Sequence, residues 1–172
     1  MALIDNIISY WKLDESSGDA ADSSGNGNTL TNLNTVAYSA AKINNGADFG
    51  TANTNKRLSK TTGIGYSGGL NAFSISFWVK IRTEPGTDVL YDLCAIHGGV
   101  NPNNTRGVIR YVDSAGTKQL QFIRQSSSFN QSVAYNIALG TANFYNIVMT
   151  YDGTTIKGYV DKAQYYINKG DL

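Results

Sequence analysis

Apolar and polar residues alternate most regularly in the segment Ala72–Ile81. Every second position there is large and apolar, namely Phe73, Ile75, Phe77, Val79 and Ile81. A period of two is that of a β-strand, in which successive side chains point to opposite faces of a sheet. The segment is therefore predicted to be a strand with one buried face, and Glu84–Gly86 is predicted to form the turn that follows it.

Two hairpins are predicted where short turn sequences separate apolar segments. One joins Phe144–Tyr151 to Thr155–Asp161, and the other joins Gly107–Val112 to Lys118–Arg124. The first turn contains Asp152-Gly153, and Asp-Gly is among the dipeptides that favour two-residue hairpin turns. Strands joined in this way run antiparallel.

Further short extended segments lie between polar, glycine-rich loops. Ile7–Leu13 is predicted to be the first strand, because Ile7, Trp11 and Leu13 fall on one face. The other predicted strands are Thr35–Tyr38, Ala47–Phe49, Arg57–Ser59, Asp88–Ile96 and Gln131–Leu139. Many short strands without a helical period predict an all-β fold, an antiparallel sandwich of two sheets. No repeat or linker is visible, so residues 1–172 are predicted to form a single domain.

Composition agrees with this fold and bears on the classes of function. The chain has 172 residues, of which only 16% are charged, and it contains 18 Gly and 11 Tyr. A net charge of +1 without a basic stripe gives no support for nucleic-acid binding. No apolar run approaches the length of a membrane span, and no signal peptide is visible at the start of the sequence.

Candidate catalytic groups are few. His97 is the sole histidine, and Cys94, in an apolar segment, is predicted to be a buried thiol. A glycosidase needs two carboxyl groups at a controlled separation. Glu15 and Glu84, the two glutamates of the chain, each lie beside a turn and do not share a strand. The protein is therefore predicted not to be an enzyme.

The segment Asp22–Asn28 is the most distinctive polar loop. Asp22, Asn26 and Asn28 offer side-chain oxygens, and the intervening glycines allow a tight backbone. Calcium binds oxygen ligands of this kind, so these three residues are candidate ligands of a structural calcium ion. A second carboxylate would come from elsewhere, and the candidates are Asp14, Asp48 and Asp161. The alternative is that the Asp and Asn side chains only form Asx turns.

A second irregular segment, residues 97–105, is a candidate ligand-binding loop. It is rich in Gly and Asn, and it begins with the sole histidine. Aromatic residues near such loops are candidates for stacking on the apolar face of a sugar ring. The predicted ligand-binding residues are Tyr91, His97, Asn101, Asn103 and Arg106.

Several segments together resemble the laminin G-like members of the concanavalin A-like jelly-roll lectins. They are Ser9–Gly18, Asp22–Asn28, Lys42–Gly50, Phe73–Lys80 and the late hairpin Tyr145–Asp161, in the order found in that family. The resemblance implies a two-sheet antiparallel jelly roll. It also implies carbohydrate binding, adhesion or assembly without catalysis, and often one structural calcium ion.

The resemblance further implies partners and a location. Glycans or surface polysaccharides are the expected ligands, and an extracellular or virion-surface location is expected. The alternative is a structural subunit of a virion or surface assembly, with other subunits as partners, because the opening of the chain also resembles phage-associated proteins. Family members usually continue past the late hairpin, so a closing strand is expected to be missing. Ile7–Leu13 would then present an open edge.

Overall fold

The computed structural model of the chain describes residues 7–51, 55–61, 64, 72–97, 105–126 and 129–169. They belong to two compact units, Met1–Gly65 and Tyr66–Leu172, which are treated separately below. All regular elements of the described residues are β-strands, and all their pairings are antiparallel. No helix in this part of the chain is long and apolar enough to cross a membrane. The predicted all-β antiparallel class is confirmed, whereas the single domain stays a prediction.

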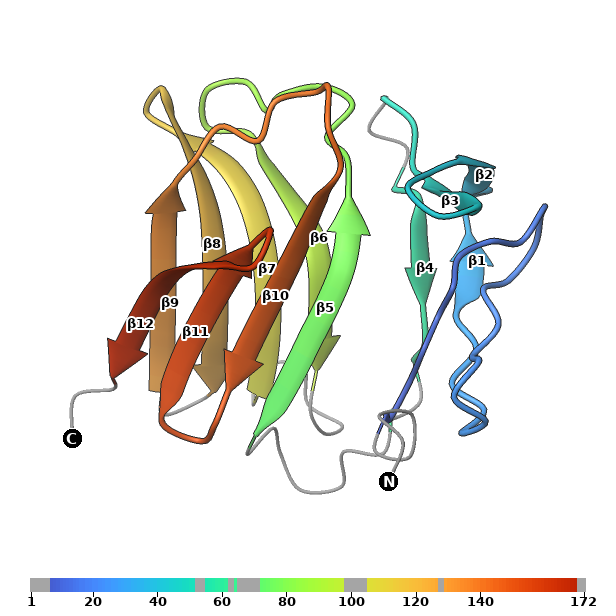
Figure 1. Cartoon of the computed structure of the whole chain (residues 1–172), viewed down its shortest axis with the longest axis horizontal. Helices are drawn as coiled ribbons and strands as arrows, with labels where there is room; N and C mark the ends of the chain where they lie inside the picture. The colour runs from blue at the N-terminus through green and yellow to red at the C-terminus, as the bar shows by residue number, and fades with distance from the viewer. Residues whose placement is uncertain are drawn as a thin grey trace. The chain divides into compact units, whose positions relative to one another are not determined.

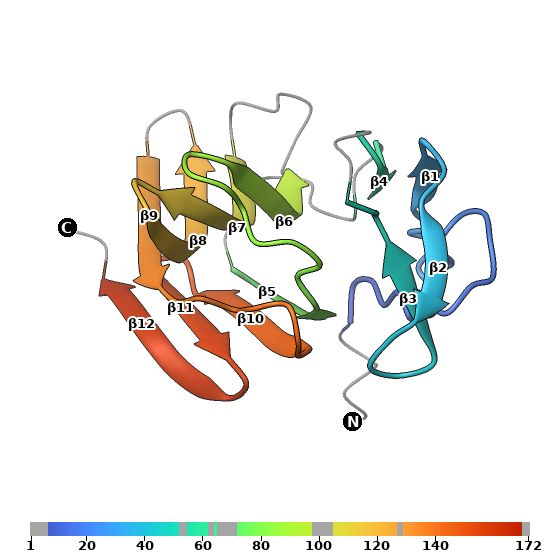
Figure 2. The ribbon, with the colours of Figure 1, turned by 90° about the horizontal axis from the view of Figure 1, so that it is seen from above.

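The second unit consists of two four-stranded sheets. Their strands are β5 (Phe73–Val79), β6 (Leu90–His97), β7 (Thr105–Ser114), β8 (Thr117–Ser126), β9 (Phe129–Asn136), β10 (Tyr145–Tyr151), β11 (Thr155–Val160) and β12 (Ala163–Lys169). One sheet has the order β12-β11-β10-β5 and the other the order β6-β7-β8-β9. The chain changes sheet after β5 and again after β9. Figures 1 and 2 show the two sheets as two layers of a sandwich.

The hydrophobic core of this unit lies between its two sheets. Phe73 and Ile147 come from one sheet, and Ile109, Tyr111 and Leu120 come from the other, and all five side chains are buried. They occupy alternate positions of their strands, as the period of two in the sequence predicts. The residues between them therefore point to the outer faces of the sheets.

Two glycines allow the sheets to approach closely. A Cβ atom at Gly107 would lie 2.9 Å from Cζ of Phe73, which belongs to the opposite sheet. A Cβ atom at Gly158 would collide with the ring of Phe122, again across the sandwich. Any side chain at these positions would push the two layers apart, so both positions need glycine for packing.

The hairpins use two-residue turns of the kind that suits twisted strands. Ala115 and Gly116 join β7 to β8 with φ values of 49° and 85°. Asp161 and Lys162 join β11 to β12 with φ values of 48° and 73°. Two successive positive φ values define a type I′ turn, whose twist matches that of the strands. The strand β12 was not predicted, because Asp-Lys lacks the Asn-Gly or Asp-Gly signature of such a turn.

The first unit contains two small strand pairs. β1 (Thr31–Leu33) pairs with β4 (Arg57–Ser59), and β2 (Ala37–Ala40) pairs with β3 (Asn45–Asp48). The bounds of β4 agree with the sequence prediction. The strand β2 begins and ends two residues later than predicted, and β3 begins two residues earlier and ends one residue earlier than predicted. Among the described residues of this unit, the buried apolar ones are Ala20 and Val36.

The prediction of a strand at Ile7–Leu13 is wrong. The predicted alternation is present, because Ile8, Tyr10 and Lys12 are exposed and the residues between them are partly buried. However, the segment makes only one isolated bridge, between Trp11 and Asp22. Leu13 has a φ of 60°, which ends the extended conformation. The segment therefore forms no strand with an open edge.

Candidate functional site

The outer face of the sheet β6-β7-β8-β9 carries a set of planar polar side chains. We call it the polar face and define it by Asp92, Arg110, Gln119, Gln121 and Asn136. The register of the sheet aligns Asp92 with Arg110 and Arg110 with Gln121, and it aligns Gln119 with Asn136 in a neighbouring row. Core residues occupy the alternate positions of the same strands, so these five side chains point away from the core.

Hydrogen bonds hold these side chains in fixed positions. Arg110 donates from Nε to Oδ1 of Asp92 at 2.6 Å and from Nη2 to Oδ2 at 3.4 Å. Gln119 donates from Nε2 to Oδ1 of Asn136 at 3.0 Å, and Gln121 donates from Nε2 to Oε1 of Gln119 at 3.2 Å. Amide groups offer a donor and an acceptor side by side, as does each hydroxyl group of a sugar. The polar face is therefore suited to a ligand with many hydroxyl groups.

The predicted ligand-binding residues do not come together at this face. Tyr91 lies on the opposite side of β6 and packs against the core. The backbones of His97 and Arg106 pair with each other across β6 and β7, whereas Asn101 and Asn103 lie outside the described residues. Their part in ligand binding stays a prediction.

Sequence reasoning missed the polar face, although a signal for it was present. Gln119 and Gln121 alternate with Leu120 and Phe122, which are buried in the core. In a strand whose alternate residues are apolar and buried, the polar residues between them lie on the outer face.

In the first unit, the carboxylate of Asp22 organises the loop Asp22–Asn28 by hydrogen bonds. Its Oδ1 accepts the N–H groups of Tyr10 at 3.0 Å and Ser24 at 2.9 Å. Its Oδ2 accepts the hydroxyl of Ser24 and the N–H of Asn28, both at 2.8 Å. Trp11 adds a bond from Nε1 to the carbonyl oxygen of Asn28 at 2.7 Å. Together these bonds attach the segment before the loop to the loop itself.

These bonds also set the protonation of Asp22. Partial desolvation acts to raise the pKa of this carboxyl group. The backbone N–H groups of Tyr10, Ser24 and Asn28, with the Ser24 hydroxyl, act in the opposite direction and lower the pKa to about 2. The group is therefore a carboxylate at neutral pH.

The carboxylate oxygens of Asp22 already have hydrogen-bond partners within the protein. Each carboxylate oxygen of Asp22 accepts two hydrogen bonds. These bonds occupy the lone pairs that a cation would need. The side chain of Asn26 donates to the carbonyl oxygens of Ile7 and Ile8, both at 3.1 Å. Among the described residues, no group of three or more His, Cys, Asp or Glu side chains is placed to hold a metal ion. The observed loop is an Asx-type turn, and calcium binding stays a prediction.

Two of the three proposed second carboxylates, Asp48 and Asp161, accept hydrogen bonds elsewhere in the structure. Asp48 accepts the N–H of Gly50 at 2.8 Å, and Asp161 accepts the N–H of Asn146 at 2.8 Å. Asp161 belongs to the second unit and Asp22 to the first. Neither bond brings a carboxylate to the Asp22 loop.

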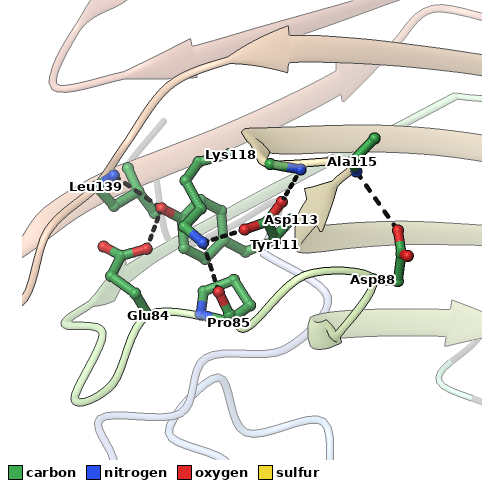
Figure 3. Close-up of polar contacts among 9 residues, drawn as sticks. Glu84, Pro85, Asp88, Tyr111, Asp113, Ala115, Lys118 and Leu139 are labelled. Atoms are coloured by element: carbon green, nitrogen blue, oxygen red, sulfur yellow. Dashed lines mark hydrogen bonds and ion pairs between the residues drawn. The ribbon is translucent and has the colours of Figure 1, made fainter.

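A polar network attaches the segment before β6 to the hairpin of β7 and β8 (Figure 3). Tyr111, whose side chain is fully buried, donates from its hydroxyl to Oε2 of Glu84 at 2.6 Å and accepts the N–H of Leu139 at 3.0 Å. Burial, followed by the bond to Glu84, raises the pKa of Tyr111. The phenol is neutral and acts as a fixed donor to the carboxylate.

A partly buried ion pair continues this network. Lys118 donates from Nζ to Asp113 Oδ2 and to the carbonyl oxygen of Pro85, and Asp113 Oδ1 accepts the N–H of Gly116 at 2.7 Å. The bond from Lys118 is the main reason that the pKa of Asp113 is lowered. Figure 3 shows both partners at the end of the β7–β8 hairpin, with Asp88 bonded to Ala115 nearby.

The two glutamates accept hydrogen bonds within the protein, and the cysteine packs against the core. Glu15 accepts the N–H of Ala21 at 2.8 Å in the first unit, and Glu84 accepts the Tyr111 hydroxyl in the second. Cys94 packs against the core, and burial raises the pKa of its thiol to about 11. The prediction of a buried thiol agrees in part with the structure, because Cys94 is partly buried against the core.

The sandwich and its polar outer face define a protein of the lectin-like β-sandwich class. Residues 60–170, which are 111 of the 172 residues, match the family described as the concanavalin A-like lectin/glucanases superfamily, of the third laminin G type. The chain belongs to this family. This agrees with the resemblance found in the sequence.

Two further similarities include the part of the chain that precedes residue 60. Residues 17–95 are similar to the family described as the N-terminal receptor-binding domain of clostridial neurotoxins. A crystal structure of residues 221–444 of an S-layer domain-containing protein from Clostridium thermocellum ATCC 27405 has a similar fold, with a TM-score of 0.55 and 17% sequence identity. The similarity covers 94% of this chain and 72% of that one. No curated protein matches the chain.

Proposed function

We propose that this protein is a non-catalytic recognition and adhesion module that binds glycans or surface polysaccharide through the polar face. The observation that carries the proposal is the fixed row of Asp92, Arg110 and Gln121, with Gln119 beside it, on an outer face that the core does not use. Membership of a lectin-like family supports it. So does the similarity of residues 17–95 to a receptor-binding family, and the proposed location is extracellular or on a particle surface.

The absence of catalysis is part of this proposal. The two glutamates belong to different units, and each carboxylate accepts a hydrogen bond from its own surroundings. A glycosidase would need two carboxyl groups flanking one bond of the substrate. Incubation with the polysaccharides that the protein binds is expected to release no reducing ends.

A glycan array tests the proposal directly. The wild-type protein is expected to bind at least one class of glycan, and the double variant Arg110→Ala/Gln121→Ala is expected to lose that binding. Thr150→Ala is a matched control, because Thr150 lies on the outer face of the other sheet. Wild-type binding that the double variant retains in full would place the ligand elsewhere.

A second candidate function is that of a structural subunit of a surface or virion assembly. The observation in its favour is the shared fold with the S-layer domain-containing protein. Light scattering distinguishes the candidates, because a building block is expected to self-associate at high concentration without glycan. A monomer that binds glycan would favour the recognition module.

A further inference from the structure

We infer that the polar face is selective for neutral glycans and that the ion pair of Asp92 with Arg110 sets this selectivity. The inference rests on the proposed glycan-binding function and names the class of ligand. It follows from the charges on the face, from the geometry of the ion pair and from the exposure of its two members.

The ion pair leaves Arg110 able to donate while cancelling its charge. The two bonds to Asp92 use two of the five N–H groups of the guanidinium. The remaining N–H groups can donate to a hydroxyl oxygen of a ligand. The carboxylate lies against the guanidinium, so an approaching anion meets a paired cation with little net attraction.

Asp92 is also the more exposed member of the pair. Its side chain is 46% exposed, and that of Arg110 is 24% exposed. A carboxylate or sulfate group of an acidic glycan would therefore meet the negative charge of Asp92 before it reached the guanidinium. Like charges placed together across an interface oppose binding.

The rest of the polar face carries no charge. Gln119, Gln121 and Asn136 are amides that are already bonded to one another, and each keeps capacity for a further donor or acceptor contact. Ala134, which is exposed, is the next residue after Gln121 in the row. Its side chain is a single methyl group, so it projects less from the sheet than the side chain of Gln121 does. Hydroxyl groups match these amides without any need for charge.

Binding measurements on two classes of polysaccharide test the inference. The neutral probes are dextran, laminarin and galactomannan, and the acidic probes are heparin and hyaluronan. The wild-type protein is expected to bind a neutral probe in preference to both acidic ones, with an affinity that changes little between about 50 mM and about 300 mM salt.

The variant Asp92→Asn is expected to change this preference. It keeps the shape of the side chain and removes its charge, so it exposes the full charge of Arg110. Affinity for heparin is expected to rise by about tenfold and to fall again with added salt. Thr150→Ala, on the other sheet, is expected to bind all probes as the wild type does. Circular dichroism and a melting curve check that both variants are folded.

The outcomes separate the two proposals. A wild-type protein that prefers heparin, or an Asp92→Asn variant whose ratio of acidic to neutral binding equals that of the wild type, would overturn the neutral-glycan inference alone. A wild-type protein that binds neither class of probe would overturn the proposed glycan-binding function and this inference with it.

Discussion

Removing the hydroxyl of Tyr111 is expected to destabilise the second unit strongly. The side chain is fully buried, and its hydroxyl connects Glu84 to the N–H of Leu139. In Tyr111→Phe, both partners keep their positions and lose their bond. The ring still fills its place in the core, so the change probes the two hydrogen bonds and not the packing.

The magnitude follows from the partners. A hydrogen bond to a charged group contributes about 1.5–3 kcal/mol, and a buried N–H left without an acceptor costs about 1–3 kcal/mol. Glu84 is only partly buried, which allows water to compensate some of the loss. We therefore expect a decrease of about 3 kcal/mol in the free energy of unfolding. For a chain of this size, that corresponds to a fall of about 6–12 °C in the melting temperature.

Urea unfolding followed by far-ultraviolet circular dichroism measures this change. Tyr159→Phe is the matched control, because Tyr159 lies on the outer face of β11 in the same unit, and its effect is expected to stay within about 0.5 kcal/mol. Glu84→Gln keeps an acceptor for the Tyr111 hydroxyl and is expected to cost less than Tyr111→Phe. A loss below about 0.5 kcal/mol for Tyr111→Phe would refute the assignment of these bonds as important for stability.

Three further predictions concern packing and the Asp22 loop. Gly158→Ala forces a methyl group against Phe122 and is expected to cost about 1–3 kcal/mol or more, whereas Gly86→Ala, whose Cβ would meet only Val89 at 3.8 Å, is expected to be mild. The pKa of Asp22 in the folded protein, about 2, lies below the usual value of 3.8 for an aspartate, so its contribution to stability is present above pH 4 and is lost as the pH falls toward 2. For this partly exposed group we expect about 1 kcal/mol, visible in tryptophan fluorescence as an acid sensitivity that Asp22→Asn lacks. If the loop binds calcium, added calcium raises the melting temperature of the wild type and not of Asp22→Asn; equal melting temperatures with and without calcium would leave the loop as a turn.

Much of the sandwich could be predicted because its strands are buried on one face. The period of two at Phe73–Val79 is a direct record of that burial, and the Asp152-Gly153 turn fixes the next pairing. The same signal was misleading at Ile7–Leu13, where the alternation of exposure is real but no strand forms. Alternation reports which side chains face water. It does not report whether a partner strand lies beside the backbone.

The candidate site was harder to predict for a different reason. Polar, glycine-rich loops often form binding sites, so the sequence predicted sites at Asp22–Asn28 and at residues 97–105. The composition of the Asp22 loop is the same whether the carboxylate binds a cation or accepts N–H groups, and only the geometry distinguishes them. By contrast, Arg110 and Gln121 lie on two different strands. They become neighbours only through the register of the sheet.

Two ion pairs among the described residues of this sheet differ in burial. Asp113 and Lys118 form a pair on the inner face, where the aspartate side chain is 6% exposed and the lysine side chain is 24% exposed, so removal of Lys118 would leave a buried negative charge. Asp92 and Arg110 form a pair on the outer face, and exposed pairs contribute little to stability, typically about 0–1 kcal/mol. A substitution at Asp113 therefore acts on the fold, whereas Asp92→Asn acts on the chemistry of a surface. This difference in burial is what allows the ligand class of the polar face to be tested in a protein that remains folded.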